Sequence, residues 1–363
     1  MSSPGDARIT IVGLGPGDPD RRTIAVQRAL DAADRIVLRS FDHPGLDDLI
    51  ADPRVTDASS VSARIDGDTR DWAAGARYAC DLAQSGNRVV VAAPGHPMYG
   101  ERLVIETLHE AAEHGIPTVV LDGLSTLDLS SSALAFDAMV DEVQIVDGAA
   151  IVHAIGDGPF GGGQFPFTPL RPMLISRVYN QHITSRLQAL LSRLFPTTHP
   201  ITIVDAAGHP TEQAIREIPL ADLAQEPGAR RLSLWVPPMD PLTAGRDPRT
   251  LQYIGARLRR PDGCPWDREQ THASLAPSFV DEVYEVVDAI EAGHTANLAE
   301  ELGDIYLHIV MQAQIAEEAG EFTLEDVFEG ISAKIVRRHP HVFGDDEVKS
   351  SIDVVGLWQR VKD

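Results

Sequence analysis

Residues 9–30 read ITIVGLGPGDPDRRTIAVQRAL, and they decide the fold of the first part of the chain. A short apolar run at residues 9–13 is followed by a turn rich in Gly and Pro, and residues 22–33 then have helical periodicity. A strand that leads through a turn into a helix is the repeating unit of sheets flanked by helices. The stretch therefore predicts an α/β fold at the start of the chain.

The same pattern continues to about residue 236. Further apolar runs predict strands at residues 36–38, 88–93, 118–121, 173–176 and 201–205. Helical patterns such as residues 101–114 separate several of these runs, so we expect a parallel sheet. Residues 1–236 are thus predicted to form one α/β domain.

The character of the sequence changes after residue 236. Residues 237–248 are punctuated by proline and have little apolar periodicity, which is typical of a linker between domains. Helical periods dominate residues 249–363, and strand-like runs disappear from the sequence. We expect an all-α second domain over residues 249–363.

The chain has 54 acidic and 31 basic residues among 363, which gives a net charge of -23. Residues 251–363 hold 22 of the acidic and 10 of the basic residues, so they carry half of the excess. A negative charge of this size repels phosphate backbones and anionic membrane surfaces. We therefore expect binding neither to nucleic acid polymers nor to membranes.

Cys80 and Cys264 are the two cysteines, and their spacing suits neither a disulfide framework nor a zinc site. The first ten residues lack the apolar run of a signal peptide, and no stretch approaches the length of a membrane-spanning helix. We expect a cytoplasmic protein.

Four acidic residues of the second domain have helical spacing. Glu282 and Glu285 lie three residues apart on one predicted helix, and Glu301 and Asp304 lie three apart on the next, so each pair shares a helix face. Packed together across a short turn, the two helices would gather four carboxylates, which suits Mg²⁺ or Mn²⁺. Spacing alone favours equally a pair of solvated acidic faces.

Two helix starts are predicted in the same region. Asn297 with Glu300, and Thr323 with Asp326, have the spacing of N-terminal caps. The helix predicted over residues 323–338 carries three basic residues near its end, Lys334, Arg337 and Arg338. Basic side chains favour helix C-termini through the helix dipole, and they are also the groups that bind a triphosphate.

These residues resemble the MazG-type nucleoside triphosphate pyrophosphohydrolases, an all-α family, from near Leu251 to the end of the chain. The resemblance rests on CPWDREQTH at residues 264–272, Glu282-x-x-Glu285, Glu301-x-x-Asp304, KIVRRHPHVFGD at residues 334–345, and the closing pair Trp358 and Lys362. Asp281 stands where many members have a further Glu. The four principal acids are intact.

The resemblance implies hydrolysis of an NTP or dNTP to the monophosphate and pyrophosphate, and a homodimer. It makes Glu282, Glu285, Glu301 and Asp304 the ligands of Mg²⁺ or Mn²⁺. We favour Glu282 or Glu285 as the base that activates the attacking water. The expected substrate-binding residues are Trp266, Lys334, Arg337, Arg338, Trp358 and Lys362. The alternative for the two tryptophans is a place in the core, where aromatic residues of helical bundles are more often found.

The opening stretch and two later loops resemble the tetrapyrrole methylase superfamily. They are GLGPGDPDRRT at residues 13–23, with Arg22 in place of the usual Leu, PGHPMYG at residues 94–100, and GLSTLD at residues 123–128. His96 stands where methylases commonly have Asp. The resemblance implies two α/β subdomains with S-adenosylmethionine between them. The implied cofactor-binding residues are Gly13, Gly15, Pro16, Gly17, Asp18, Pro94, Gly95, His96, Ser125 and Thr126.

The order of the two domains is similar to that of the bacterial YabN-type fusion proteins, and it leaves three functions open. The first is a pyrophosphohydrolase whose activity resides in the second domain. The second is an S-adenosylmethionine-dependent methyltransferase that acts on a small molecule. The third makes the first domain a non-catalytic ligand sensor or oligomerisation module. We favour the first, because its four acids are intact, whereas His96 weakens the argument for methyl transfer.

Overall fold

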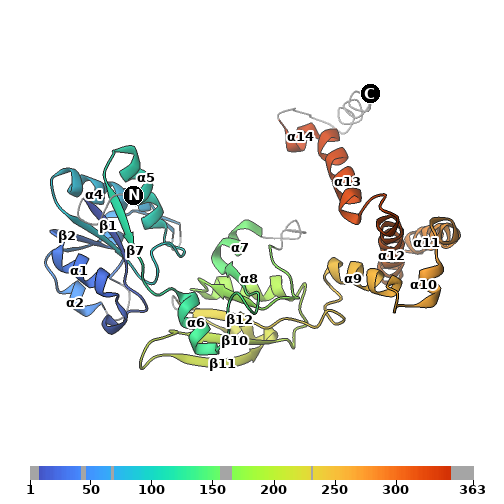
Figure 1. Cartoon of the computed structure of the whole chain (residues 1–363), viewed down its shortest axis with the longest axis horizontal. Helices are drawn as coiled ribbons and strands as arrows, with labels where there is room; N and C mark the ends of the chain where they lie inside the picture. Colours follow the sequence, from blue (N-terminus) through green and yellow to red (C-terminus); the bar gives the residue numbers. More distant parts are fainter. Residues whose placement is uncertain (1–7, 42–45, 67–68, 156–165, 230–231, 345–363) are drawn as a thin grey trace. The chain divides into compact units, whose positions relative to one another are not determined.

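The computed structural model describes residues 8–41, 46–66, 69–155, 166–229 and 232–344. The chain divides into two compact units, Met1–Asp240 and Pro241–Asp363. The division falls inside the linker predicted for residues 237–248. We call the first of these unit 1 and the second unit 2 (Figure 1).

The first half of unit 1 is built on a parallel sheet with strand order β3-β2-β6-β1-β7. The strands are β1 (Ile9–Gly13), β2 (Arg35–Leu38), β3 (Val55–Asp57), β6 (Val89–Ala93) and β7 (Thr118–Leu121). The helices of this half are α1 (Ile24–Ala32), α2 (Asp47–Ile50), α3 (Ala58–Val61), α4 (Trp72–Gln84) and α5 (Arg102–Glu113), with the short helix η1 (Pro19–Arg21) and the ribbon β4 (Arg64–Asp66) and β5 (Thr69–Arg70). The predicted strands at residues 9–13 and 118–121 are confirmed as predicted, and those at residues 36–38 and 88–93 within one residue.

Both faces of this sheet are buried, which explains why its strands are apolar without interruption. Ile9 and Ile11 of β1 join a cluster that includes residues of α4 and α5. Val12 points to the other face and joins a cluster with Val26 and Leu30 of α1. The helices α1 and α4–α5 therefore cover opposite faces, as the alternation of side chains along a strand requires.

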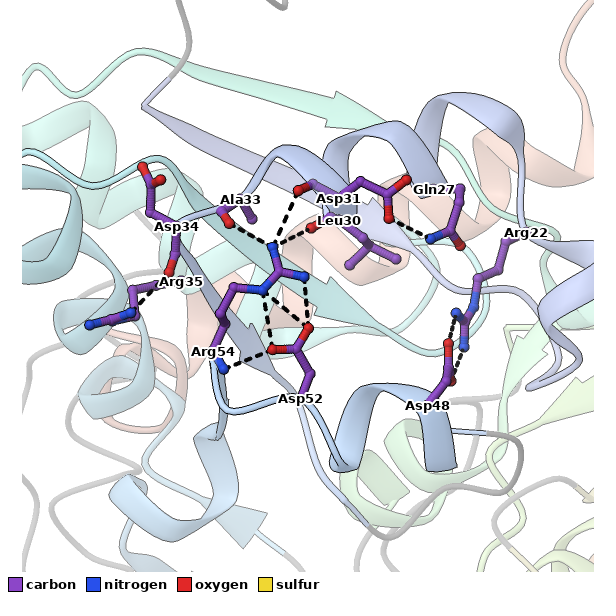
Figure 2. A network of polar contacts seen from close by, with 10 residues as sticks. All are labelled: Arg22, Gln27, Leu30, Asp31, Ala33, Asp34, Arg35, Asp48, Asp52 and Arg54. Atoms are coloured by element: carbon purple, nitrogen blue, oxygen red, sulfur yellow. Dashed lines mark hydrogen bonds and ion pairs between the residues drawn. The ribbon is translucent and has the colours of Figure 1, made fainter.

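Arg54 fixes the end of α1 against the loop before β3 (Figure 2). Its Nη1 donates hydrogen bonds to the carbonyl oxygens of Leu30, Asp31 and Ala33 at 3.1, 3.3 and 2.8 Å. Its Nε and Nη2 bind the carboxylate of Asp52, with an Nη2–Oδ2 distance of 2.7 Å. One guanidinium thus satisfies the carbonyls that a helix C-terminus leaves without partners.

Arg22, the residue that departs from the methylase-like pattern, has a structural role. Its side chain is 2% exposed and holds the carboxylate of Asp48 on α2 in a two-pronged contact, Nη1–Oδ2 at 2.5 Å and Nη2–Oδ1 at 2.9 Å (Figure 2). An aliphatic side chain would fill the same space without this charged contact. Arg22, which stands in place of the usual Leu, therefore links the start of α1 to α2.

The second half of unit 1 has a mixed sheet of order β11-β10-β12-β9-β8, not the parallel sheet that we expected. Only β8 and β9 run parallel, and the pairs β9–β12, β12–β10 and β10–β11 are antiparallel. The elements are β8 (Gln144–Asp147), β9 (Met173–Ser176), β10 (Pro200–Asp205), β11 (Ala214–Pro219), β12 (Leu232–Val236), α6 (Thr126–Leu134), α7 (Gly148–Ile155), α8 (Gln181–Leu191) and η2 (Leu220–Gln225). A short connection joins β10 to β11, and a connection of that length permits antiparallel pairing but no parallel crossover.

Unit 2 is helical over its described residues, as predicted. Its helices are α9 (Pro248–Arg259), α10 (Pro265–Glu269), α11 (His272–Ala292), α12 (Thr295–Ala319), α13 (Leu324–Arg338) and α14 (Pro340–Phe343). Its buried core is small, with Val310, Ala313 and Leu324 at the centre. None of the described helices combines the length and apolarity that crossing a membrane requires.

The two predicted helix caps of unit 2 have different outcomes. Thr323 and Asp326 form a reciprocal capping box at the start of α13, so this prediction is confirmed. The prediction for Asn297 and Glu300 is wrong, because α12 already begins at Thr295. Gly293, at φ 68°, ends α11 in a left-handed conformation, and the chain re-enters a helix two residues later.

Candidate functional site

Three of the four predicted metal ligands come together on the hairpin of α11 and α12. Glu282, Glu285 and Glu301 each offer a carboxylate oxygen, and these three atoms lie within 4.8 Å of one another. Glu282 and Glu301 are partly buried and Glu285 is exposed. The spacing of three along α11 places its two glutamates on one face, and the tight turn at Gly293 returns the chain so that Glu301 faces them.

Asp304 lies one helical turn beyond Glu301 and outside this group of three. Its charge still acts on Glu301, because Asp304, Glu285 and Glu300 all raise the pKa of the Glu301 carboxyl. Partial burial is the largest cause of the same rise. Carboxylates held this close repel one another, and the energetic cost is relieved by a proton or by a cation.

The chemistry of the donor set fits a hard divalent cation. Three glutamate carboxylates offer only oxygen atoms, and no cysteine belongs to the group. Oxygen donors of this kind suit Mg²⁺ and Mn²⁺, whereas sulfur and imidazole donors suit zinc and copper. The group therefore has the donor atoms that a hard divalent cation requires.

His308 is a neighbour of this cluster that the spacing of the acids did not predict. Its Nε2 lies 3.9 Å from Oε1 of Glu282, and its ring stacks on that of Phe279 with a centroid distance of 5.4 Å. His308 follows Asp304 by four residues, so helical periodicity places it on the same face of α12. Extending the helical spacing of Glu301 and Asp304 by one further turn would have predicted His308 as a neighbour of the acids.

The described members of the predicted substrate-binding set come from helices other than the two that carry the acids. Trp266 on α10 is 63% exposed, so its alternative place in the core is wrong. Lys334, Arg337 and Arg338 lie in the last turns of α13, and within residues 232–344 no ion pair joins them to the acidic cluster. Trp358 and Lys362 fall outside the described residues.

In unit 1 the three methylase-like loops meet at a junction of glycines. A Cβ atom on Gly13 would lie 2.5 Å from the carbonyl oxygen of Gly95 and 2.8 Å from the nitrogen of Gly123. A Cβ atom on Gly123 would lie 2.4 Å from the carbonyl oxygen of Gly95. Only glycine permits this approach, which brings together the loops that follow β1, β6 and β7.

A cavity of about 1020 Å³ in unit 1 opens beside this junction. Six of the ten predicted cofactor-binding residues line it: Gly15, Pro16, Pro94, Gly95, His96 and Thr126. Gly13, Gly17, Asp18 and Ser125 are not among its lining residues. Asp18 instead caps η1 and Ser125 caps α6, so both side chains have structural partners.

His96 has a defined hydrogen-bonding arrangement at the edge of this cavity. Its Nδ1 accepts a hydrogen bond from the backbone N–H of Met98 at 3.1 Å, which leaves Nε2 to carry the ring proton. The Nε2 atom lies 3.4 Å from Oδ1 of Asp122. The loop thus directs an imidazole N–H toward an acid.

The structure also places in the cavity a partly buried acid that the motifs did not reveal. The side chain of Glu101 is 14% exposed, and its Oε2 lies 3.1 Å from Nε of Arg39, whose guanidinium lies 5.1 Å from the ring centroid of Trp72. The hydroxyl groups of Tyr99 and Ser176 share a hydrogen bond, with 3.3 Å between their oxygen atoms. Burial of the Tyr99 phenol raises the pKa of Tyr99. Tyr99 lies within the second loop, at residues 94–100, and Glu101 directly follows it, and these positions were the signal available in the sequence.

Comparison with protein families gives two matches. Residues 8–224 match the family of tetrapyrrole (corrin/porphyrin) methylases. Residues 270–343 match the MazG nucleotide pyrophosphohydrolase domain. The first match covers both halves of unit 1, and the second covers the hairpin that carries the acidic cluster.

Individual relatives agree with these matches. YabN of Bacillus subtilis is 33% identical over 98% of this chain and 70% of its own length. The nucleoside triphosphate pyrophosphohydrolase/pyrophosphatase MazG of Thermotoga maritima is 53% identical over 26% of this chain and 37% of its own. A uroporphyrinogen-III C-methyltransferase of Synechococcus elongatus is 25% identical over 62% of this chain and 89% of its own.

The two family matches cover residues 8–224 and 270–343, and each agrees with the fold of the unit to which it aligns. The chain spans 70% of YabN but less than half of the Thermotoga maritima pyrophosphohydrolase. The chain therefore belongs to the tetrapyrrole (corrin/porphyrin) methylase family and is a fusion of the YabN type, with a MazG nucleotide pyrophosphohydrolase domain after the methylase domain.

Proposed function

We propose that unit 2 hydrolyses nucleoside triphosphates, NTP or dNTP, to the monophosphate and pyrophosphate. The observation that carries the proposal is the cluster of Glu282, Glu285 and Glu301, whose ligand atoms lie within 4.8 Å of one another. The MazG domain match over residues 270–343 supports it, as does the activity in the name of the Thermotoga maritima relative.

Glu282, Glu285 and Glu301 would hold Mg²⁺ or Mn²⁺, with Asp304 as the fourth ligand. Such an ion, when bound, offsets the negative charge of the phosphates and polarises their oxygens. The carboxylate of Glu282 or Glu285 takes the proton of the attacking water. As the water oxygen bonds to phosphorus, the P–O bond that links the monophosphate to pyrophosphate breaks.

The remaining predicted residues bind the substrate. Lys334, Arg337 and Arg338 supply positive charge for phosphate oxygens that the cation does not reach. The exposed indole of Trp266 offers a surface on which a base stacks. Trp358 and Lys362 complete the proposed set of substrate contacts.

A homodimer is part of the proposal, because unit 2 leaves many apolar side chains in water. Exposed apolar residues recur along two of its helices, namely Val280, Val283, Tyr284, Val287 and Ile290 of α11 and Val327, Phe328, Ile331, Ile335 and Val336 of α13. Apolar surface of this extent on a small core is stabilised by packing against a second copy. Light scattering after gel filtration is expected to give twice the chain mass, and a monomeric mass would contradict the dimer.

The test of the hydrolase is the release of pyrophosphate from a panel of NTPs and dNTPs by the full chain, with and without Mg²⁺. Activity is expected to require the cation and to fall by about 100-fold or more in Glu285→Gln and in Asp304→Asn. Glu317→Gln, an exposed acid farther along α12, is the matched control and is expected to keep full activity. Release of single phosphates, or full activity in either site variant, would refute the proposal.

A second candidate function is the binding of S-adenosylmethionine by unit 1, with or without methyl transfer. It is favoured by one observation, that six of the predicted cofactor-binding residues, drawn from all three methylase-like loops, line one cavity of about 1020 Å³. Calorimetric titration of the full chain with S-adenosylmethionine tests it. Heat that saturates at one cofactor per chain is expected, and its absence with unit 1 folded would favour a sensor or oligomerisation role.

A further inference from the structure

His308 is a polar side chain that packs inside the hairpin of α11 and α12. Its side chain is 13% exposed, and its ring stacks on that of Phe279 with a centroid distance of 5.4 Å and an interplanar angle of 25°. The stack covers one face of the imidazole and fixes the plane of the ring. A ring held in this way presents its edge, and therefore its nitrogen atoms, in a fixed direction.

The edge of this ring is directed at Glu282. The Nε2 atom of His308 lies 3.9 Å from Oε1 of Glu282, whose side chain is 24% exposed. Phe279 and Glu282 are three residues apart on α11 and therefore share one face of that helix. One face of α11 thus supplies both the ring on which His308 stacks and the carboxylate that its Nε2 faces.

The contact between His308 and Glu282 is close to hydrogen-bond distance. Its length of 3.9 Å is about 1 Å more than that of a hydrogen bond between nitrogen and oxygen. The terminal torsion of a glutamate side chain is soft, so a small rotation of the Glu282 carboxylate closes the gap. A protonated imidazole nitrogen donates a hydrogen bond. His308 is therefore placed to donate to one oxygen of Glu282 and to leave the other oxygen for a cation.

The acidic neighbours of Glu282 make such a partner useful. One carboxylate oxygen of Glu282 lies within 4.8 Å of oxygens of Glu285 and Glu301. Like charges at this distance repel one another, and the repulsion favours rotation of Glu282 away from the other two acids. An N–H group that faces the same carboxylate offsets this repulsion and restricts the rotation.

His308 contacts one member of the acidic cluster without joining it. Among the described residues, the ligand atoms that lie within 4.8 Å of one another come from the three glutamates, although imidazole nitrogens are also metal ligands. Residues that orient a metal-binding carboxylate are part of most metal sites, and their loss weakens metal binding or activity by about 10–100-fold. The place of His308 beside Glu282 is the place of such a residue.

We propose that His308 is a positioning residue, which holds the carboxylate of Glu282 in the orientation that cation binding by unit 2 requires. The contact of Nε2 with Glu282, made by a ring that Phe279 fixes, carries the proposal. The proposal rests on the proposed function of unit 2, and it adds to the four acids a residue that acts only through one of them.

The first experiment measures Mn²⁺ binding to the full chain without nucleotide, from the loss of the electron paramagnetic resonance signal of free Mn²⁺. His308→Phe keeps a ring beside Phe279 but removes both nitrogen atoms, and it is expected to weaken binding by about tenfold. His308→Gln keeps an N–H donor and is expected to recover most of that loss. His308→Leu replaces His308→Phe if the latter fails to fold.

Two further variants make the binding measurement specific. Glu285→Gln/Glu301→Gln removes two of the three clustered carboxylates and defines the Mn²⁺ binding that other acids of the chain contribute. Tyr306→Phe is the matched control, because it removes one polar group from α12 where that helix packs against the core around Val310. It is expected to bind Mn²⁺ as the wild type does.

The second experiment follows pyrophosphate release while the Mn²⁺ concentration is varied. His308→Phe is expected to need about tenfold more Mn²⁺ for half of its maximal rate. Its maximal rate at saturating Mn²⁺ is expected to stay near that of the wild type, because His308 acts on cation binding and not on the reacting atoms.

Equal Mn²⁺ affinity of His308→Phe and the wild type, or an equal loss in His308→Phe and His308→Gln, would overturn the positioning role. A lower maximal rate with an unchanged Mn²⁺ requirement, or no Mn²⁺ binding by the wild type, would overturn it as well. If Mn²⁺ binding follows the expected order but the wild type releases no pyrophosphate, the hydrolase is refuted and the role of His308 stands. If the wild type hydrolyses NTP but all His308 variants bind Mn²⁺ alike, only the role of His308 is refuted.

Discussion

The glycine junction of unit 1 shows how single residues position the cavity. Gly13 and Gly123 are separated by more than a hundred residues, yet each allows the backbone of the other to approach where a Cβ atom would clash. Their loops follow neighbouring parallel strands, β1 and β7. Ligands of open α/β sheets bind at this carboxyl end, so the junction forms the floor of the candidate site.

We predict that Gly123→Ala destabilises unit 1 by about 1–3 kcal/mol, because its Cβ would lie 2.4 Å from the carbonyl oxygen of Gly95 and backbone has to move. Calorimetric unfolding of the full chain measures the effect. Gly245→Ala is the control, since its Cβ would have no neighbour within 4 Å. Equal stability of the two variants would show that the junction relaxes without cost.

Asp34 and Arg88 give a second prediction for single residues, in the acid range. Asp34 accepts hydrogen bonds from the backbone N–H of Arg88 at 2.8 Å and from its guanidinium, which lowers the Asp34 pKa to about 2. A folded-state pKa below the unfolded value, about 3.9, means that the charged form stabilises the fold. This stabilisation is complete above the unfolded pKa and disappears as the pH falls toward 2.

Asp34→Asn removes that contribution. We therefore expect the difference in free energy of unfolding between wild type and variant to be constant above pH 5 and to shrink as the pH falls from 4 to 3. Urea unfolding at several pH values measures the difference. A difference that grows in acid would contradict the assignment.

At the scale of elements, the start of a helix could be predicted from the sequence only where a side chain caps it. The capping box at the start of α13 was predicted because its two members, Thr323 and Asp326, are only three residues apart in the sequence. The start of α12 was not, because His294 makes no side-chain cap there and the preceding Gly293 alone ends α11. The capping residue of a helix is visible in a sequence only where a side chain forms the cap.

We predict that Thr323→Ala lowers the stability of unit 2 by about 1 kcal/mol. The variant loses the hydrogen bond from the Asp326 N–H to Oγ1 at 3.3 Å and the bond from Oγ1 to the Asp326 carboxylate at 2.8 Å. Thr295→Ala, at the first residue of α12, is the matched control because no cap bond depends on it. Thermal unfolding that is equal in both variants would contradict the prediction.

Burial alone did not decide which strands were predicted, because β12 is buried at four of its five residues and was not among the predicted strands. The run of β9 is buried at every residue, and its bounds were predicted at residues 173–176. Strand β11 is exposed along almost its whole length and carries Arg216 and Glu217, so its sequence has no apolar signal. The missed strands β11 and β12, and their antiparallel pairing, explain why the second sheet was expected to be parallel.

At the scale of the whole molecule, the two units match different families and have separate cores. Units with their own cores fold and act separately in general. This separation leads to a prediction about where each activity resides.

We predict that residues 241–363 alone retain most of the Mg²⁺-dependent pyrophosphate release, and that residues 1–240 alone have none but keep their ligand cavity. Circular dichroism establishes that each fragment folds, and the pyrophosphate assay and ligand titration are then repeated on each. Loss of hydrolysis in a folded 241–363 fragment would show that unit 1 is needed for catalysis.

The sequence by itself determined the α/β and all-α units, four of the five strands of the first sheet, the acidic pairs on two helices and the methylase-like loops. These features depend on periodicity and spacing within short stretches, which a linear sequence displays. Only the tertiary structure decided that Glu282, Glu285 and Glu301 converge while Asp304 stands outside their group, and that Glu101 pairs with Arg39 inside a cavity. Distances between residues on different elements depend on how those elements pack, and charge balance in a cavity depends on which side chains line it. Neither property has a local signal in the sequence.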